Sequence, residues 1–250
     1  MQIYVINLAR RPDRLAKMDA GLTALGLPYT LINAVDGADI SSPAGHRLSD
    51  AAYACYLSHI KTYRAFLETG ASHCVIMEDD VVLSPRLPEA LAASCFYTDQ
   101  NAIVRLERPT NIYWSDPSFN TPFAVASQNR LATYALLTKS FGTGAFVLSR
   151  QVAKAVVEQH SAPELDIDVR LFDPRRAGHL GFKILQFSPS LALQRQHYDG
   201  IQDSDIPHRP AHALQNAHPL LLNMLINLKL FIAGLARLMG LSRRFPFDDK

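Results

Sequence analysis

Hydrophobic and polar positions follow two periods along this chain, one typical of strands and the other of helices. Short apolar runs rich in β-branched residues predict buried strands at 2–8, 29–32, 74–77, 102–106, 145–148 and 182–187. Apolar residues that recur every three or four positions predict helices at 12–25, 50–67, 85–96 and 151–159. Pro12 suits the first turn of the first helix, and Gly26 suits its end.

The order of these elements indicates the fold class. Strands and helices alternate through the first 110 residues, so we expect an α/β fold with a Rossmann-like, mostly parallel central sheet flanked by helices. Ligands of such sheets bind beyond the carboxyl ends of the strands. The stretch 109–129 is rich in Pro, Ser, Asn and aromatic residues and predicts an irregular loop or lid.

The C-terminal region contains a long apolar segment at 219–241. It approaches the length of a membrane span, but Asn223, Asn227, Lys229 and Arg237 interrupt it, and charged residues are costly inside a bilayer. An amphipathic helix lying in the membrane interface, with its basic end near anionic lipid, fits this pattern better than a span. A helix docked on the protein's own core or on a second copy is the alternative.

The composition is that of a folded domain with an appended segment. Of 250 residues, 48% are hydrophobic and 19% are charged, which excludes a disordered chain. The net charge of +2 gives no bias toward nucleic acid, so we expect no nucleic-acid partner. Three cysteines without C-x-x-C spacing, and a start without a signal-peptide pattern, predict a cytoplasmic protein. We divide the chain into a main domain at 1–215 and a basic amphipathic membrane-associating segment at 216–250.

Three consecutive acids are the most informative feature. Glu78, Asp79 and Asp80 directly follow one apolar run, and Val81 begins another. Carboxylates beside a buried strand repel one another and lose hydration, so a bound cation would stabilise them. Oxygen ligands suit Mg²⁺ or Mn²⁺, ions that commonly bridge carboxylates to a substrate diphosphate. A solvated turn is the alternative, but the apolar flanks place the acids in or beside a strand.

Polar residues also gather where the first strand meets its helix. Asn7, Arg10, Arg11, Asp13 and Arg14 offer donors and acceptors for a nucleotide, and arginines together with a helix N-terminus suit its phosphates. A solvated helix start would give the same pattern.

Four further residues have both a functional and an ordinary interpretation. His59 lies inside the helix predicted at 50–67, where a phosphate contact and a core histidine are both open. Asp166 and Asp168 precede apolar residues and suit either a general base or a helix N-terminus. His197 follows a predicted strand end. It could complete the acidic metal site as a ligand, or it could be an ordinary loop residue.

Several segments together resemble glycosyltransferase family 25, the group of bacterial lipooligosaccharide galactosyltransferases and related collagen galactosyltransferase domains. The resemblance rests on VINLARRPDR at 5–14, NAVDG at 33–37, YACYLSHIKTYR at 53–64, VIMEDDVVL at 75–83, FGTGAFVLSR at 141–150 and IDVRLF at 167–172. They occur in the order found in the family. The stretch 107–129 matches nothing in this pattern and leaves the acceptor open.

The resemblance implies a GT-A-type fold in the domain at 1–215. It also implies transfer of a sugar, galactose in particular, from a UDP-sugar to an oligosaccharide or glycolipid acceptor such as a lipopolysaccharide core. The expected cofactor is Mn²⁺ or Mg²⁺, held by Asp80 and Glu78. Inversion at the anomeric carbon requires a base, for which Asp168 is the candidate and Asp166 the reserve. The expected donor-binding residues are Asn7, Arg11, Arg14, Asp36, His59, Glu78, Asp79, Gly142 and Thr143.

A membrane-bound acceptor would place the enzyme on the inner face of the cytoplasmic membrane. Two other classes stay open. One is another metal-dependent phosphoryl-transfer or hydrolase enzyme, although the chain has neither G-x-x-x-x-G-K-[ST] nor G-x-S-x-G. The other is a catalytically degenerate, membrane-associated binding protein.

Overall fold

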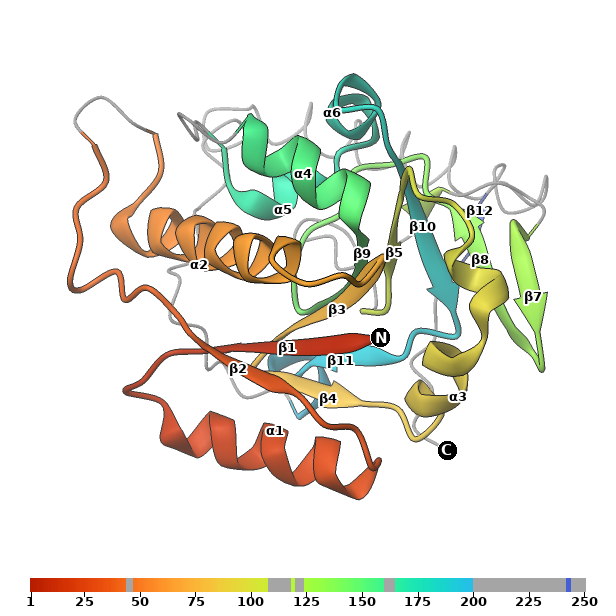
Figure 1. Ribbon diagram of the computed structural model, residues 1–250, viewed down its shortest axis with the longest axis horizontal. Coiled ribbons are helices and arrows are strands. Elements are labelled where there is room, and N and C mark those ends of the chain that lie inside the picture. The colour runs from red at the N-terminus through yellow and green to blue at the C-terminus, as the bar shows by residue number, and fades with distance from the viewer. Residues whose placement is uncertain (44–46, 108–117, 120–123, 160–164, 200–241, 244–250) are drawn as a thin grey trace, which may run out of the picture.

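The computed structural model describes residues 1–43, 47–107, 118–119, 124–159, 165–199 and 242–243. Its centre is an eight-stranded sheet in the order β2-β1-β3-β9-β5-β10-β8-β7 (Figure 1). These strands are β1 (Gln2–Asn7), β2 (Thr30–Asn33), β3 (His73–Glu78), β5 (Ala102–Arg105), β7 (Ala126–Gln128), β8 (Leu131–Ala135), β9 (Ala145–Ser149) and β10 (Lys183–Ser188). The predicted α/β fold with a central sheet is therefore confirmed.

The sheet is mixed. Six of the eight strands run in one direction, as predicted, but β9 and β8 run in the other. Strand β9 lies between β3 and β5 and is antiparallel to both. Its first residue therefore lies at the same edge of the sheet as the last residues of β1 and β3. Parallel pairing, as expected from the sequence, is found among β2, β1 and β3 and again between β5 and β10.

Helices cover both faces of the sheet (Figure 1). One face carries α1 (Pro12–Ala24) and α3 (Leu87–Ala92), and the other carries α2 (Asp50–Leu67), α4 (Arg150–Glu158), α5 (Ile167–Phe172) and α6 (Pro174–His179). Strand β1 shows why. Ile3 and Val5 pack into the core on the α1 face, while Tyr4 and Ile6 pack into the core on the α2 face, because successive strand residues point to opposite faces.

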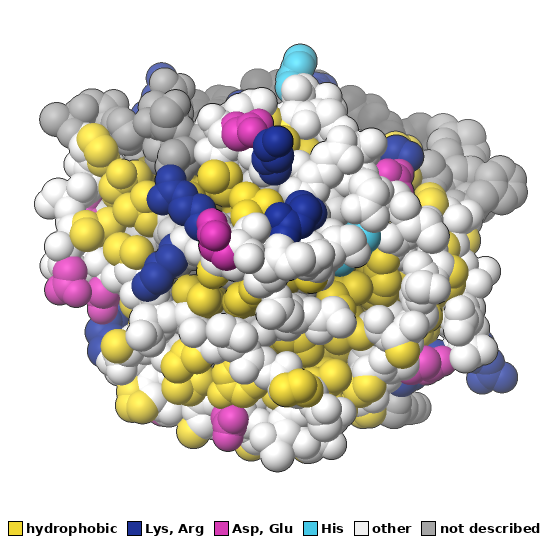
Figure 2. All heavy atoms as spheres, viewed as in Figure 1, with side chains coloured by type: hydrophobic (Ala, Val, Ile, Leu, Met, Phe, Trp, Pro, Cys, Tyr) yellow, Lys and Arg dark blue, Asp and Glu magenta, His cyan; other side chains and the backbone are white. Residues whose placement is uncertain are grey.

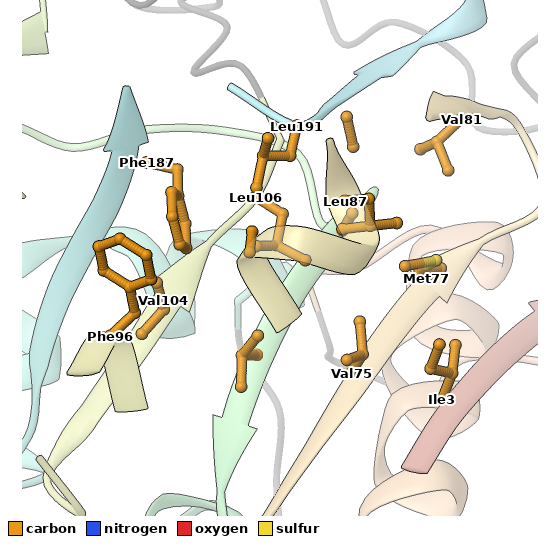
Figure 3. Close-up of a cluster of buried hydrophobic side chains, with 14 of the residues drawn as sticks. Ile3, Val75, Met77, Val81, Leu87, Phe96, Val104, Leu106, Phe187 and Leu191 are labelled. Atoms are coloured by element: carbon orange, nitrogen blue, oxygen red, sulfur yellow. The ribbon is translucent and has the colours of Figure 1, made fainter. Parts of the chain in front are cut away.

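The core on the α1 face joins several elements. Figure 3 shows side chains of β1, β3, β5 and β10 directed toward those of α3 and the short strand β4 (Val81–Leu83). Phe96 and Phe187 meet edge to face with ring centroids 4.7 Å apart. Side chains from several strands and helices pack around β4 and hold it, together with the acids that precede it, against the sheet.

The predicted helices are present, although three of the four have different bounds: α1 ends at Ala24, α4 covers Arg150–Glu158 and α3 covers Leu87–Ala92. The helix predicted at 50–67 has those bounds, and it begins where the Ser49 hydroxyl accepts a hydrogen bond from the Ala52 N–H. Gly26 ends the first helical segment with φ of +65°. The helix predicted at 85–96 is shorter, because it stops at Ala92 and a 3₁₀ turn covers Ser94–Tyr97.

Two small sheets complete the described chain. Strand β11 (Ala192–Gln194) pairs with β4 and leads into the short helix α7 (Arg195–Tyr198), while β6 (Ser118–Phe119) pairs with β12 (Ser242–Arg243). The stretch predicted as a loop or lid at 109–129 is described only in part. There the prediction is wrong for β6 and for β7, which forms the edge of the central sheet and pairs with β8.

The C-terminal segment predicted at 219–241 lies outside the described residues, as does the boundary between 215 and 216. Within the part of the chain that the structure describes, no helix is long and apolar enough to cross a bilayer. On the face shown in Figure 2, the described acidic and basic side chains are interspersed rather than gathered by sign.

Candidate functional site

The candidate site lies at the edge of the sheet where β1 and β3 end. These strands pair in parallel, with Ile6 opposite Glu78, so Asn7 and the three acids lie together. The antiparallel β9 starts at this edge, and the Glu78 N–H donates to the Gly144 carbonyl at 2.9 Å. Glu107 also lies here, because its N–H donates to the Ala145 carbonyl at 3.1 Å.

Asp79 is held by residues that the sequence had placed at the same site. Its two carboxylate oxygens accept hydrogen bonds from Asn7 Nδ2 at 2.6 Å and Arg14 Nη1 at 3.3 Å, and all three side chains are buried. Burial raises the pKa of Asp79, and the Arg14 charge and the Asn7 amide oppose that rise. Asp79 therefore fastens α1 and the end of β1 to β3.

Glu78 points to the other face of the sheet, as the alternation of strand side chains requires. Its Oε1 accepts a hydrogen bond from the Thr143 hydroxyl at 2.6 Å and lies 3.2 Å from His59 Nε2 on α2. Burial acts to raise the pKa of Glu78, but His59, Thr143 and Arg14 together lower it below its ordinary value. His59, predicted from its position on the helix, thus contacts the acidic cluster directly.

Asp80 has the least satisfied carboxylate of the three. The side chain is half-buried, and its Oδ1 is inaccessible to solvent and has no hydrogen-bond partner among the described residues. Burial, and then the charges of Glu78 and Asp79, raise the pKa of Asp80 to about 7. A buried carboxylate oxygen without a donor, beside two further acids, fits a divalent cation with a preference for oxygen ligands.

A single segment joins the acids that come from different elements. The Gly142 N–H donates to Asp168 Oδ2 at 3.1 Å, the Thr143 hydroxyl donates to Glu78, and the Gly144 N–H donates to Glu107 Oε2 at 2.8 Å. We call this segment, residues 142–144, the acid-binding turn.

Glycine is required at both ends of the acid-binding turn. Gly142 has φ of +84°, which strains residues with a side chain. A Cβ on Gly144 would lie 2.8 Å from Val81 Cγ1 and 3.1 Å from Glu107 Cδ, closer than packed carbon atoms approach. The sequence placed Gly142 and Thr143 at the site but gave no role to Gly144.

Asp168 lies in the first turn of α5, against the acid-binding turn. Its Oδ1 accepts from the Val169 N–H at 2.6 Å, and burial raises its pKa despite the hydrogen bond from Gly142. Asp166 occupies the N-cap position, but its side chain does not cap the helix. The structure therefore brings Asp168 to the acidic cluster, and Asp166 lies close enough for its charge to raise the pKa of Asp168 further.

Two of the predicted donor-binding residues, Asp36 and Arg11, lie nearer the surface than the acidic cluster. Asp36 accepts from the Ala38 N–H at 3.0 Å and from Arg10 Nε at 2.6 Å, and these bonds lower its pKa. Arg11 forms an ion pair with Asp13 at 3.0 Å, and its hydrogen bond lowers the pKa of Asp13 to about 2.

His197 is exposed on α7. That helix begins beside the acids, because the Arg195 N–H donates to the Asp80 carbonyl at 2.7 Å. However, neither His197 nor Asp80 belongs to the close group of three potential metal ligands found in the described chain. That group is Cys55, His59 and Glu78.

Glu107 and its neighbour Arg105 were missed by sequence reasoning. Both are fully buried, with Arg105 Nη2 3.5 Å from Glu107 Oε2 and 2.9 Å from the Phe141 carbonyl. Burial raises the pKa of Glu107 to about 8, so this carboxyl is protonated at neutral pH. The available signal was two charged residues of opposite sign at the end of an otherwise apolar strand, which are rarely buried without a partner.

A cavity of about 240 Å³ lies next to this site, between α1 and the β4–β11 pair. Its lining combines apolar residues such as Met18, Leu25 and Val81 with the cationic side chains Lys17 and Arg195. None of the acids of the site lines it.

The chain has relatives of known class. Residues 1–171 match the profile of glycosyltransferase family 25, described as a lipopolysaccharide biosynthesis protein. Over 227 residues the chain is 26% identical to the lacto-N-neotetraose biosynthesis glycosyltransferase LgtB of Neisseria gonorrhoeae, covering 82% of this chain and 78% of that protein. Over 97 residues it is 30% identical to the inactive glycosyltransferase 25 family member 3 of Mus musculus, covering 32% of this chain and 16% of that protein.

Among solved structures, the chain is similar to a glycosyltransferase involved in the glycosylation of the major capsid of PBCV-1. That superposition has a TM-score of 0.42 at 8% identity and covers 80% of this chain and 98% of the other. The family profile and the Neisseria relative together define the class of this protein, a glycosyltransferase. The chain belongs to glycosyltransferase family 25, which confirms the resemblance seen in its motifs.

We expect Glu107→Gln to flatten the pH dependence of stability. The contribution of the protonated carboxyl to the free energy of unfolding is fully present below its ordinary pKa of 4.5 and is lost as the pH rises through about 8. Glutamine keeps an acceptor oxygen for the Gly144 N–H and does not titrate. Urea unfolding in the presence of a chelator, measured at several pH values between about 5 and 8, should show a smaller fall for the variant than for the wild type.

The matched control is Glu158→Gln, on the exposed side of α4, where the carboxyl is 62% exposed. It should keep the wild-type slope. A wild-type slope in Glu107→Gln would contradict a buried, protonated Glu107.

Proposed function

We propose that this chain transfers a sugar, galactose in particular, from a UDP-sugar to a hydroxyl group of a saccharide acceptor, with inversion at the anomeric carbon. The acceptor belongs to the lipopolysaccharide or lipooligosaccharide class, or to another cell-surface glycan. Family membership supports the reaction class, and the role of the Neisseria relative in lacto-N-neotetraose biosynthesis supports a saccharide acceptor.

One observation carries the metal dependence in this proposal. Asp80 Oδ1 is buried and has no donor among the described residues, and it lies next to two other acids. Asp80 and Glu78 would hold Mn²⁺ or Mg²⁺, with His197 as the reserve ligand from α7. When bound, the cation would supply positive charge for the departing diphosphate. In this proposal Asp79 is assigned to donor binding rather than to the cation, because Arg14 forms an ion pair with it and Asn7 donates to its other oxygen.

The remaining donor-site residues divide into two groups. The first group holds the acids in place and acts on the donor through them. Asn7 and Arg14 hold Asp79. His59 and Thr143 hold Glu78. Arg11 and Asp36 lie nearer the surface at the end of β1, where a nucleotide would meet them.

Asp168 is the proposed general base. The Gly142 and Val169 N–H groups orient its carboxylate, which retains lone pairs to accept the acceptor hydroxyl proton. Because burial raises its pKa, Asp168 is a stronger base than an exposed aspartate. Asp166 is the reserve.

We expect UDP together with Mn²⁺ to raise the melting temperature of the wild-type chain, and Asp80→Asn to remove that increase. The substitution keeps the size of the side chain but removes the charge that the cation requires. Thermal unfolding with UDP alone, Mn²⁺ alone and both together measures the effect. Glu158→Gln is the control and should respond as the wild type does. An unchanged response in Asp80→Asn would remove Asp80 from the cation site.

We expect Asp168→Asn to bind UDP and Mn²⁺ normally but to lower turnover roughly 10²- to 10⁴-fold, the range typical of a lost general base. Release of UDP from UDP-Gal, UDP-Glc, UDP-GlcNAc and UDP-GalNAc, with lipooligosaccharide cores as acceptors, measures turnover and identifies the donor. Asp166→Asn is the comparison and should retain most activity. Full activity in Asp168→Asn would assign the base elsewhere, and phosphate release from sugar phosphates would favour a hydrolase.

The proposal includes a peripheral location on the inner face of the cytoplasmic membrane, supported by the amphipathic pattern of 219–241. On a helix, Leu225 and Leu228 would lie opposite Asn223 and Asn227. We expect Leu225→Glu with Leu228→Glu to reduce sedimentation with anionic liposomes, because charge on the apolar face disfavours insertion. Asn223→Ser with Asn227→Ser is the control. Equal sedimentation of both variants would reject this location.

A further inference from the structure

Three metal-ligating side chains of different chemistry meet beside the acidic cluster. Cys55 offers a sulfur atom, His59 a nitrogen atom and Glu78 an oxygen atom, and the three atoms all lie within 4.8 Å of one another. We propose that these residues form a zinc site, which shares Glu78 with the proposed Mn²⁺ or Mg²⁺ site and differs from it in its sulfur and nitrogen ligands.

The positions of the three ligands follow from the fold. Cys55 and His59 are four residues apart on α2, so they lie on the same face of that helix, one turn apart. Glu78 ends β3 on the sheet face that α2 covers. Cys55 is half-buried, whereas His59 is fully buried. A cation can therefore approach from the side of Cys55 and reach an imidazole whose place is already fixed.

His59 is oriented for ligation through Nε2. Its ring stacks on Phe146, with centroids 6.0 Å apart and planes inclined by 23°. Nδ1 lies 3.4 Å from the Tyr63 hydroxyl, and Nε2 lies 3.2 Å from Glu78 Oε1. With zinc on Nε2, the proton resides on Nδ1 and is donated to the Tyr63 oxygen. A partner on the second ring nitrogen is the usual means of orienting a metal-binding histidine.

The ligand set selects the ion. Sulfur and imidazole nitrogen with one carboxylate suit Zn²⁺, whereas Mg²⁺ and Mn²⁺ prefer oxygen. Zinc bonds of about 2.0–2.3 Å place tetrahedral ligand atoms roughly 3.5 Å apart. The spacing of His59 and Glu78 already meets this distance, so rotation of the Cys55 side chain supplies the remaining adjustment. Water would occupy the fourth position.

Zinc binding removes the Cys55 thiol proton, keeps the ring proton of neutral His59 on Nδ1, and breaks the hydrogen bond between His59 and Glu78. The Cys55 thiol proton leaves to solvent as the Zn–S bond forms. Nε2 of His59 binds the metal with its lone pair and no longer donates to Glu78. Zinc thus replaces a hydrogen bond between α2 and β3 with two metal bonds, and Glu78 becomes a ligand that the two kinds of cation would share.

Cobalt(II) alone tests the site, since it occupies zinc sites and reports thiolate ligation by absorption. The chelator-treated full chain, without nucleotide, should develop a sulfur-to-cobalt charge-transfer band and the visible bands of tetrahedral Co²⁺, and added Zn²⁺ should remove both. Cys55→Ser should lose the charge-transfer band and weaken Zn²⁺ binding by more than about tenfold. Loss of a residue that only hydrogen-bonds to a metal ligand already lowers metal affinity by about that factor.

The matched control is Cys95→Ser, because Cys95 is also half-buried but donates to Gln128 Oε1 at 3.2 Å. It should keep both bands, and far-ultraviolet circular dichroism should show that each variant is folded. Absence of the charge-transfer band from the wild type, its survival in Cys55→Ser, or its loss in Cys95→Ser would overturn the proposal. Since no donor or acceptor is present, the result is independent of the proposed transferase activity.

Discussion

Repulsion among buried carboxylates is the constraint on which this site depends. Glu78, Asp79, Asp80, Glu107 and Asp168 gather at one edge of the sheet, and two unit charges 4 Å apart near a protein surface repel by about 4 kcal/mol. A whole domain is stable by only about 5–15 kcal/mol, so the five cannot all remain ionised and unpaired. Four of the five are stabilised by the protein itself, among them Asp168, which accepts hydrogen bonds from the Gly142 and Val169 N–H groups. Arg14 pairs with Asp79, His59 and Thr143 contact Glu78, and Glu107 keeps its proton.

The reversed direction of β9 makes these solutions possible. Because β9 is antiparallel to β3 and β5, the turn that precedes it lies at the edge where those strands end. Its backbone N–H groups at Gly142 and Gly144 then reach carboxylates on α5 and after β5, while the Thr143 hydroxyl reaches β3. A parallel strand in the same place would begin at the opposite edge. The acids therefore share hydrogen-bond donors from one turn because β9 departs from the expected order.

Much of this arrangement could be predicted from local patterns, and the remainder depends on tertiary contacts. The bounds of α2 and the strands β1 and β3 follow from periodicity and from the Ser49 cap. The acidic trio and Asp168 were found because their residue types stand out against apolar neighbours. Strand β8 and the buried Glu107 were missed. Leu131–Ala135 is fixed by pairing with β10 and β7, and Glu107 by the hydrogen bond from Gly144, and neither contact has a signal in the local sequence. The contact of Cys55 and His59 with Glu78 likewise joins segments that only the fold brings together.

The three adjacent acids have different roles because side chains alternate between the two faces of the sheet along β3, which is a local property of the strand. Side chains along β3 alternate between faces, with Ile76 in the α2-face core and Met77 in the α1-face core. Continued past the strand end, this alternation sends Glu78 toward His59 on α2 and Asp79 toward Arg14 on α1. Each of these two acids meets a basic residue on the helix that covers its face. Asp80 follows at the turn into β4, and its buried Oδ1 meets no hydrogen-bond donor among the described residues. It is therefore the acid left to be satisfied by something other than a protein side chain.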